Sequence, residues 1–241
     1  MNAEEYERMY RLEDTYWWFV GRHHLAIDLL DRAFGGRRDL RILDIGCGTG
    51  AMSELLAAWG EVVSADCSPL ALAFSRRRGL VRVCAADAMH LPFRDESFDA
   101  VVALDIIEHL PDDAVAAREI RRVLRPGGRL VATVPACPSL WSAHDVALMH
   151  QRRYVGSQVR RLMDAGGLRV RRLTHATTLL FPLAWVTRVL ARRSGSLHAR
   201  LVPLSGPANR LLVGVMAAEN ALLRRCDLPF GLSVCCVAER V

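Results

Sequence analysis

A short stretch near residue 45 brings together residue types that can hold a nucleotide-like ligand. Three glycines at alternate positions, Gly46, Gly48 and Gly50, follow a short apolar run that ends at Ile45. Glycine lacks the Cβ atom that keeps other residues from turning sharply and lying against a ligand. Asp44, just before this loop, supplies a carboxylate that would repel a pyrophosphate and hold an ammonium group.

Two further acids end the next two segments of strand character. Asp66 closes segment 61–66, and Asp87 closes segment 81–87. Open α/β sheets bind their ligands at the carboxyl ends of the strands, so we expect these carboxylates to share one site. The glycine spacing followed by Asp66 also fits a dinucleotide-binding pattern. The residues alone therefore leave two kinds of nucleotide ligand open.

The elements that position these residues alternate between strand and helix. We expect strands at 41–45, 61–66, 81–87, 98–104, 129–134, 168–173 and 231–238. We expect helices at 3–34, 51–59, 68–78, 113–124 and 157–165, the last of them capped by Ser157. This alternation indicates an α/β fold. The sheet should be Rossmann-like, doubly wound, seven-stranded and mostly parallel, with an antiparallel last strand.

The chain of 241 residues is long enough to bury one large core. We expect a single domain over 1–241, with a helical lid at 1–36, a ligand-binding core at 37–175 and 231–241, and a helical insertion at 176–230. Two segments of the insertion, 179–193 and 209–225, are amphipathic. They could roof an apolar pocket, contact another subunit or rest on a membrane surface.

Composition excludes several classes of protein. The net charge of +6 comes from arginine alone, in scattered pairs, which does not indicate a nucleic-acid-binding face. Seven cysteines without CxxC spacing indicate reduced thiols, a cytoplasmic location and no metal site. The first residues lack the apolar core of a signal peptide, and the longest apolar run, 176–187, is too short to span a bilayer.

The segment around the glycine loop resembles a known family. Leu43-Asp44-Ile45-Gly46-Cys47-Gly48-Thr49-Gly50 is similar to motif I of the class I S-adenosylmethionine (SAM)-dependent methyltransferases. Later motifs of the small-molecule group often labelled type 11 follow in order, at Asp66, Asp87-Ala88, 98–102, Glu108-His109-Leu110 and 119–128. The resemblance covers about residues 40–135 and extends more weakly to Leu173.

The resemblance implies SAM as cofactor and S-adenosylhomocysteine as product. Its cofactor site would comprise Asp44, Gly46, Cys47, Gly48, Gly50, Asp66, Cys67, Asp87, Ala88, Met89 and Leu104. Asp44 would take the amino group, Asp66 the ribose hydroxyls and Asp87 the adenine amine. In relatives an aromatic N-terminal helix closes over the cofactor. Trp18 would then face the sulfonium and Arg22 the carboxylate, although these aromatics could equally fasten the first helix to the core.

The loop after the fifth strand, 135–154, should open beside the cofactor. His144 and His150 lie in it, and histidine titrates near neutrality, so both are candidate bases for the acceptor's proton. Trp141, Asp145, Arg153 and Tyr154 are the candidate acceptor-binding residues. A packed turn is the alternative interpretation for His150 and Tyr154.

The sequence therefore predicts a SAM-dependent methyltransferase that modifies an oxygen, nitrogen or carbon atom of a small, apolar molecule. It would act as a monomer or homodimer, without nucleic acid and without a transmembrane segment, although peripheral membrane contact stays open. A non-catalytic protein that binds SAM or a partner is the alternative. A nucleic-acid methyltransferase is disfavoured, since residues 103–107 lack the Asp/Asn-Pro-Pro-Tyr and Pro-Cys patterns of those enzymes.

Overall fold

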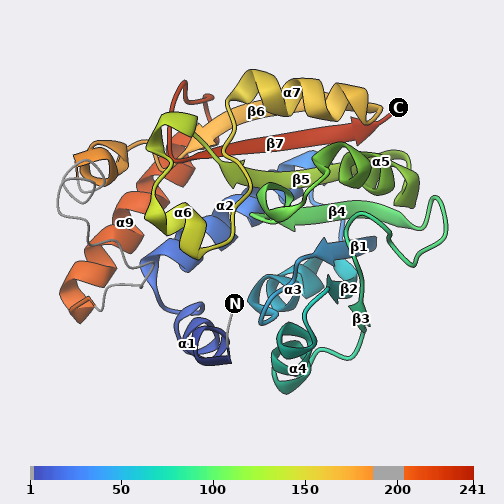
Figure 1. Ribbon diagram of the computed structural model, residues 1–241, viewed down its shortest axis with the longest axis horizontal. Coiled ribbons are helices and arrows are strands. Elements are labelled where there is room, and N and C mark those ends of the chain that lie inside the picture. Colours follow the sequence, from blue (N-terminus) through green and yellow to red (C-terminus); the bar gives the residue numbers. More distant parts are fainter. Residues whose placement is uncertain (1–2, 187–203) are drawn as a thin grey trace.

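The computed structural model describes residues 3–186 and 204–241, without the side chain of His144. Its centre is a seven-stranded sheet with the strand order β3-β2-β1-β4-β5-β7-β6 (Figure 1). The strands are β1 (Leu40–Ile45), β2 (Gly60–Asp66), β3 (Val83–Ala85), β4 (Phe98–Leu104), β5 (Leu124–Pro135), β6 (Leu168–Ala176) and β7 (Ser233–Arg240).

The strand directions confirm the predicted Rossmann-like, mostly parallel sheet with an antiparallel last strand. β1 pairs in parallel with β2 and β4, and β4 pairs in parallel with β5. β7 lies between β5 and β6 and runs antiparallel to both. The carboxyl ends of β1, β2, β3, β4 and β5 therefore meet at one edge of the sheet.

Helices cover both faces of the sheet because alternate strand residues point to opposite sides. On one face Leu43 packs with residues of α5 (Asp113–Val123) and α7 (Gly156–Ala165). On the other face Ile42 packs with residues of α2 (Trp17–Phe34), α3 (Ala51–Leu56) and α9 (Gly206–Leu223). Three further helices are α1 (Ala3–Leu12), α4 (Pro69–Arg77) and α6 (Ala143–Ala147), and residues 181–186 are also helical. Short 3-10 turns lie at Ala57–Trp59, Ile107–His109 and Pro138–Leu140.

The N-terminal region differs from the single helix expected over 3–34. It forms two helices, α1 and α2, separated by residues 13–16. The break occurs where Glu13 and Asp14 turn toward Arg78 and accept hydrogen bonds from its guanidinium, at 2.6 and 3.1 Å. α2 buries Leu25, among others, against the sheet, so of these two helices only α1 lies over the glycine loop (Figure 1).

Other boundaries also differ from those expected. β3 is shorter, and β6 extends to Ala176. Ser157 does not cap α7. The N-cap is Val155, whose N–H donates to the side-chain oxygen of Gln158 at 2.9 Å. Of the predicted helix at 179–193, residues 181–186 are helical and 187–193 lie outside the described residues.

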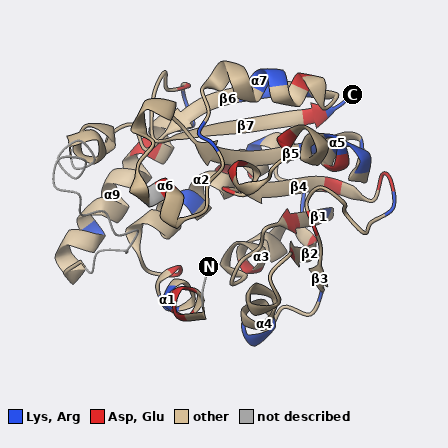
Figure 2. Ribbon diagram, in the orientation of Figure 1, with Lys and Arg blue, Asp and Glu red and all other residues tan. Residues whose placement is uncertain are grey.

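Within residues 3–186 and 204–241, no helix combines the length and the apolar character needed to cross a bilayer. Basic residues are distributed over several helices, including α4, α5, α7 and α9 (Figure 2). The sheet edge that carries Asp44, Asp66 and Asp105 is acidic instead.

Replacing Gly60 by alanine should strongly destabilise the protein. The added Cβ would lie 1.9 Å from the carbonyl oxygen of Leu40, so β1 and β2 would have to separate where their pairing begins. We expect a cost on the order of 3 kcal/mol in the free energy of unfolding, measured in urea. Gly35→Ala is the matched control, because its φ of +58° is also left-handed, but its Cβ would have no non-neighbouring atom of the described residues within 4 Å. This control should lower the free energy of unfolding by about 1–2 kcal/mol. Equal losses in the two variants would show that the contact with Leu40 is not what destabilises Gly60→Ala.

Candidate functional site

The loop after β1 adopts a conformation that requires glycine. Gly46, Gly48 and Gly50 have φ angles of 72°, 55° and 92°. A Cβ on Gly46 would lie 2.9 Å from Cγ1 of Ile106, and one on Gly48 would lie 3.1 Å from Cε of Met9. The loop backbone is thus in close contact with the segment after β4 on one side and with α1 on the other.

Asp66 joins this loop to the end of β2. Its Oδ2 accepts the Gly48 N–H at 3.0 Å, and its Oδ1 accepts the Ser68 N–H at 2.8 Å. Each carboxylate oxygen has two acceptor positions, so each retains one for a ligand. Ser68 in turn caps α4, accepting the Ala71 N–H at 3.4 Å, as the Ser-Pro pair predicts.

Asp44 lies beneath the loop and is 2% exposed. Its Oδ2 accepts the Ser53 hydroxyl at 2.5 Å, and Ser53 accepts the Ser64 hydroxyl at 2.7 Å. Burial, with a smaller contribution from the negative charge of Asp66, raises the pKa of Asp44 to about 7. The carboxyl is therefore partly protonated at neutral pH, and a nearby cation would favour its ionised form.

The third acid, Asp87, lies just beyond β3 and beside the end of β2, since Ala85 pairs with Asp66. It is exposed, and its Oδ1 accepts the Met89 N–H at 2.9 Å. Of its neighbours in the predicted cofactor site, Ala88 is buried and Cys67 is exposed.

The N-terminal helix α1 is held against the glycine loop by contacts that the sequence analysis missed. The Thr49 hydroxyl donates to Glu13, which is 4% exposed, and Arg78 donates to the same carboxylate. Arg78 also donates to the Thr49 carbonyl at 3.2 Å. Tyr6 is buried, with its ring stacked on Phe74 of α4. α1 therefore covers the loop.

Arg22 lies at the same sheet edge, as expected, but it already has protein partners. Its guanidinium donates to Asp105 just after β4, to the Thr133 hydroxyl of β5 at 2.8 Å and to the Ser233 hydroxyl of β7 at 2.7 Å. It also lies 5.0 Å from the ring centroid of Trp18. Leu104, the last residue of β4, adjoins Asp105 and is partly buried.

The loop after β5 is organised around a buried carboxylate, Asp145. It is 0% exposed and accepts the Ser142 N–H at 2.9 Å, Nε of Arg153 at 2.6 Å and Nδ1 of His150 at 3.0 Å. Together these hydrogen bonds and the Arg153 charge hold the pKa of Asp145 well below its usual range, against the effect of burial. With Nδ1 donating to Asp145, Nε2 of His150 carries the lone pair.

The other predicted base and acceptor-binding residues of the loop after β5 have different surroundings from His150. Tyr154 packs in the core and donates its hydroxyl to Asp113 at the start of α5, at 2.7 Å, so it fits the alternative of a packed turn. Arg153 is 7% exposed and also donates to the Ala136 carbonyl, at 2.8 Å. Trp141 is partly buried, and His144 lies in α6 with its side chain outside the described part of the structure.

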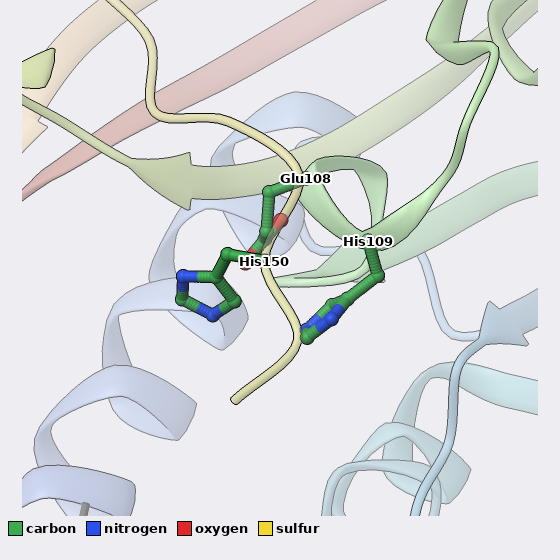
Figure 3. Close-up of side chains that lie close together, drawn as sticks. All are labelled: Glu108, His109 and His150. Carbon is green, nitrogen blue, oxygen red and sulfur yellow. The ribbon is translucent and has the colours of Figure 1, made fainter. Parts of the chain in front are cut away.

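A second group missed by the sequence analysis is Glu108, His109 and His150 (Figure 3). Glu108 is 0% exposed, and neither carboxylate oxygen has a hydrogen-bond partner among the residues that the structure describes. The rings of His109 and His150 lie edge to face, 4.8 Å apart between centroids. Adjacent Glu108 and His109 just after a strand are a signal available from sequence. Their contact with His150 depends on the tertiary fold of the loop after β5, which the sequence pattern does not reveal.

Comparison with known proteins finds similarity to methyltransferases over the segment that contains the glycine loop. The family model described as a methyltransferase domain matches residues 43–132. A demethylmenaquinone methyltransferase of Staphylococcus aureus (strain MRSA252) is 37% identical over 114 residues, which are 44% of this chain and 47% of that protein. The chain thus spans less than half the length of this curated relative.

Solved structures share the fold at lower identity. Phosphoethanolamine N-methyltransferase 2 of Haemonchus contortus, in complex with SAM, has a TM-score of 0.60 at 21% identity over 89% of this chain and 52% of that one. The [4+2]-cyclase SpnF has a TM-score of 0.59 at 24% identity over 90% of this chain and 80% of that one. At such identities the two structures are evidence for the fold alone.

Asp44 should make the stability of the protein depend on pH. Its pKa of about 7 in the folded state exceeds the ordinary value of 3.8, so the folded protein binds more protons between these values. The stability that Asp44 contributes is complete below pH 3.8 and is lost as pH rises through 7. Relative to Asp44→Asn, the wild type should lose about 1.4 kcal/mol per pH unit within this window, measured by urea unfolding.

Burial also raises the pKa values of Glu13 and Glu108. Both residues are present in the wild type and in Asp44→Asn, so their pH-dependent contributions to stability cancel in the difference. Parallel stability curves for wild type and Asp44→Asn would show that the Asp44 carboxyl titrates normally.

Proposed function

We propose that this chain, which belongs to the class I SAM-dependent methyltransferase family, transfers a methyl group from SAM to a small molecule. The observation that carries the proposal is the glycine loop with Asp44 and Asp66 at its base. Both carboxylates are oriented by protein donors, and Asp66 keeps an acceptor position on each oxygen.

The residues present fit the cofactor. A Cβ on Gly46 or Gly48 would crowd the loop's neighbours, and glycine at both positions leaves backbone available to a ligand. Asp66 would accept the ribose hydroxyls, Asp87 the adenine amine and Asp44 the amino group. Arg22 lies near the same edge with Trp18 against it, so these two would hold the carboxylate and the sulfonium end. When bound, SAM supplies an electrophilic methyl group on sulfur.

Arg22 would share its N–H donors between Asp105 and the carboxylate of the cofactor. Its existing bonds to Thr133 and Ser233 hold the guanidinium at the sheet edge, and two of its five N–H donors are on the nitrogen that faces Asp105. We infer that Arg22 positions Asp105 and contacts the cofactor with its remaining donors.

On the acceptor side, we infer that His150 is the stronger of the two candidate bases. Asp145 fixes its tautomer and stabilises the imidazolium that forms when Nε2 takes a proton. Arg153 positions Asp145 rather than the acceptor. A base of this kind is useful to a hydroxyl or ammonium acceptor, whose proton must leave, and we therefore favour an oxygen or nitrogen acceptor over carbon.

The proposal can be tested by calorimetry with SAM, S-adenosylhomocysteine and NAD, followed by a labelled-methyl assay over a panel of small hydroxylated and amino compounds. Binding of SAM and its product but not of NAD, with label transferred to one class of acceptor, is the expected result. SAM binding without transfer to any acceptor would favour a non-catalytic role, and binding of NAD alone would reject the family's chemistry here.

Asp66→Ala should weaken SAM binding at least tenfold, because charge-assisted hydrogen bonds contribute about 1.5–3 kcal/mol. Asp66→Asn should lose less SAM affinity than Asp66→Ala, since its one carbonyl oxygen can still accept a backbone N–H. Isothermal titration calorimetry measures both. Asp39→Ala, which removes an exposed acid paired with Arg37, is the control and should bind SAM normally. Unchanged affinity in Asp66→Ala would remove this residue from the site.

His150→Gln should lower kcat on the identified acceptor by about a hundredfold or more, the usual contribution of a positioned base. SAM affinity should stay within twofold, a ratio that corresponds to under 1 kcal/mol. Asp145→Asn should lower kcat in the same direction, because it loosens the imidazole. His24→Gln, an exposed histidine on α2, is the control. A normal kcat in His150→Gln would end its assignment as base.

A further inference from the structure

We propose that Glu108, His109 and His150 bind a divalent transition-metal ion such as Zn²⁺. One ligand atom from each residue lies within 4.8 Å of the others (Figure 3). Two imidazoles and one carboxylate form a common set of three protein ligands for such ions, with further coordination positions left open. No metal site was expected from the sequence. Glu108 and His109 are distant from His150 along the chain and come together only in the fold.

The buried carboxylate of Glu108 is the observation that points to a ligand. It is 0% exposed, and both oxygens lack a partner among the described residues, whereas Asp44, Asp66 and Asp145 each have hydrogen-bond donors. An unpaired buried carboxyl is costly, and a bound cation removes that cost by supplying the missing positive charge.

Both histidines are oriented as metal ligands usually are. Nδ1 of His150 lies 3.0 Å from Oδ1 of Asp145, and Nδ1 of His109 lies 3.4 Å from the Met149 carbonyl oxygen. A carboxylate or carbonyl on one ring nitrogen fixes the tautomer and leaves the lone pair on Nε2. His109 is partly buried and His150 has 8% of its side chain exposed, so an ion would enter from the His109 side.

The nearby charges are already balanced. Arg22 and Arg153 lie close enough to Glu108 to affect its pKa, but the first is paired with Asp105 and the second with Asp145. With both guanidinium groups paired, the positive charge that a Glu108 carboxylate needs would come from the ion itself. The opposing charges of Asp105 and Asp145 also lessen the repulsion that the two guanidinium groups would exert on a cation.

The ion site adjoins the proposed methyl-transfer site. Glu108 follows Ile106, the residue packed against Gly46, and His150 is the candidate base. An oxygen of the acceptor could occupy an open coordination position, which would make its proton more acidic. This consequence rests on the proposed function. With metal bound, Nε2 of His150 would be used for coordination, so the proton released by the metal-bound acceptor oxygen would pass to solvent water. His150 would then act as base only in the metal-free chain.

The site can be tested on the full chain without a histidine tag, in the absence of SAM and acceptor. Isothermal titration with ZnCl₂, and visible absorption with CoCl₂, should show one ion bound per chain. Glu108→Gln and His109→Gln should each weaken binding at least tenfold, while His24→Gln, which removes a histidine from the outer face of α2, should leave it unchanged. Circular dichroism should show that each variant is folded.

Two results would overturn the proposal. One is the absence of stoichiometric Zn²⁺ or Co²⁺ binding by the wild type. The other is binding that is equally tight in Glu108→Gln and His109→Gln, which would place the ion on other groups such as the exposed thiols of Cys67 and Cys226. SAM affinity of the same variants, measured separately, should be unchanged. If the wild type binds SAM but no metal ion, this inference fails and the proposed function stands. If it binds a metal ion but not SAM, the proposed function fails and the metal site stands.

Discussion

Burial of negative charge at one edge of the sheet is the constraint on which the rest of the structure depends. Asp44 and Asp145 are buried at or near the carboxyl ends of the strands, and Asp66 and Asp105 are partly buried there. Each is supplied with a donor of a different kind. Asp44 has a serine hydroxyl, Asp66 has the backbone N–H groups of Gly48 and Ser68, Asp105 has the Arg22 guanidinium, and Asp145 has an imidazole and a second guanidinium. Glu108 has no such donor among the described residues, and this is why we propose that it binds an ion.

These donors also connect segments that are distant in the sequence. Arg22 of α2 bonds to side chains that follow β4, lie on β5 and begin β7, so one side chain brings three strands and a helix together. Arg78, at the end of α4, bonds to Glu13 and to the carbonyl of Thr49 and thereby links α1 to the glycine loop. The helix that covers the loop and the loop itself are consequently stabilised by the same residue.

The parts of the fold that follow from local pattern were predictable. β4 spans the residues expected, because its apolar side chains are buried on both faces and an exposed turn precedes it. The glycine loop and the capping Ser68 were also predictable, since each depends on the conformational preference of one or two residues. The break at 13–16 was not, because a helical pattern continues through it. It coincides with tertiary contacts of Arg78, which donates to Glu13, and of Asn209, which accepts the Trp17 N–H and donates to the Thr15 carbonyl. The partners of Arg22 and Glu108 likewise depend on tertiary packing, which a local pattern does not contain.

The antiparallel direction of β7 has a practical consequence. Its first residue, Ser233, lies beside Arg22 at the sheet edge formed by the carboxyl ends of β1 to β5. Its last residue, Arg240, therefore lies at the opposite edge, where its guanidinium donates to the Leu124 carbonyl at 2.6 Å. The N-terminus, by contrast, leads into α1 next to the glycine loop (Figure 1). A fusion partner or surface tether attached after Val241 should leave the ligand edge open to solution, whereas the same attachment before α1 would crowd it.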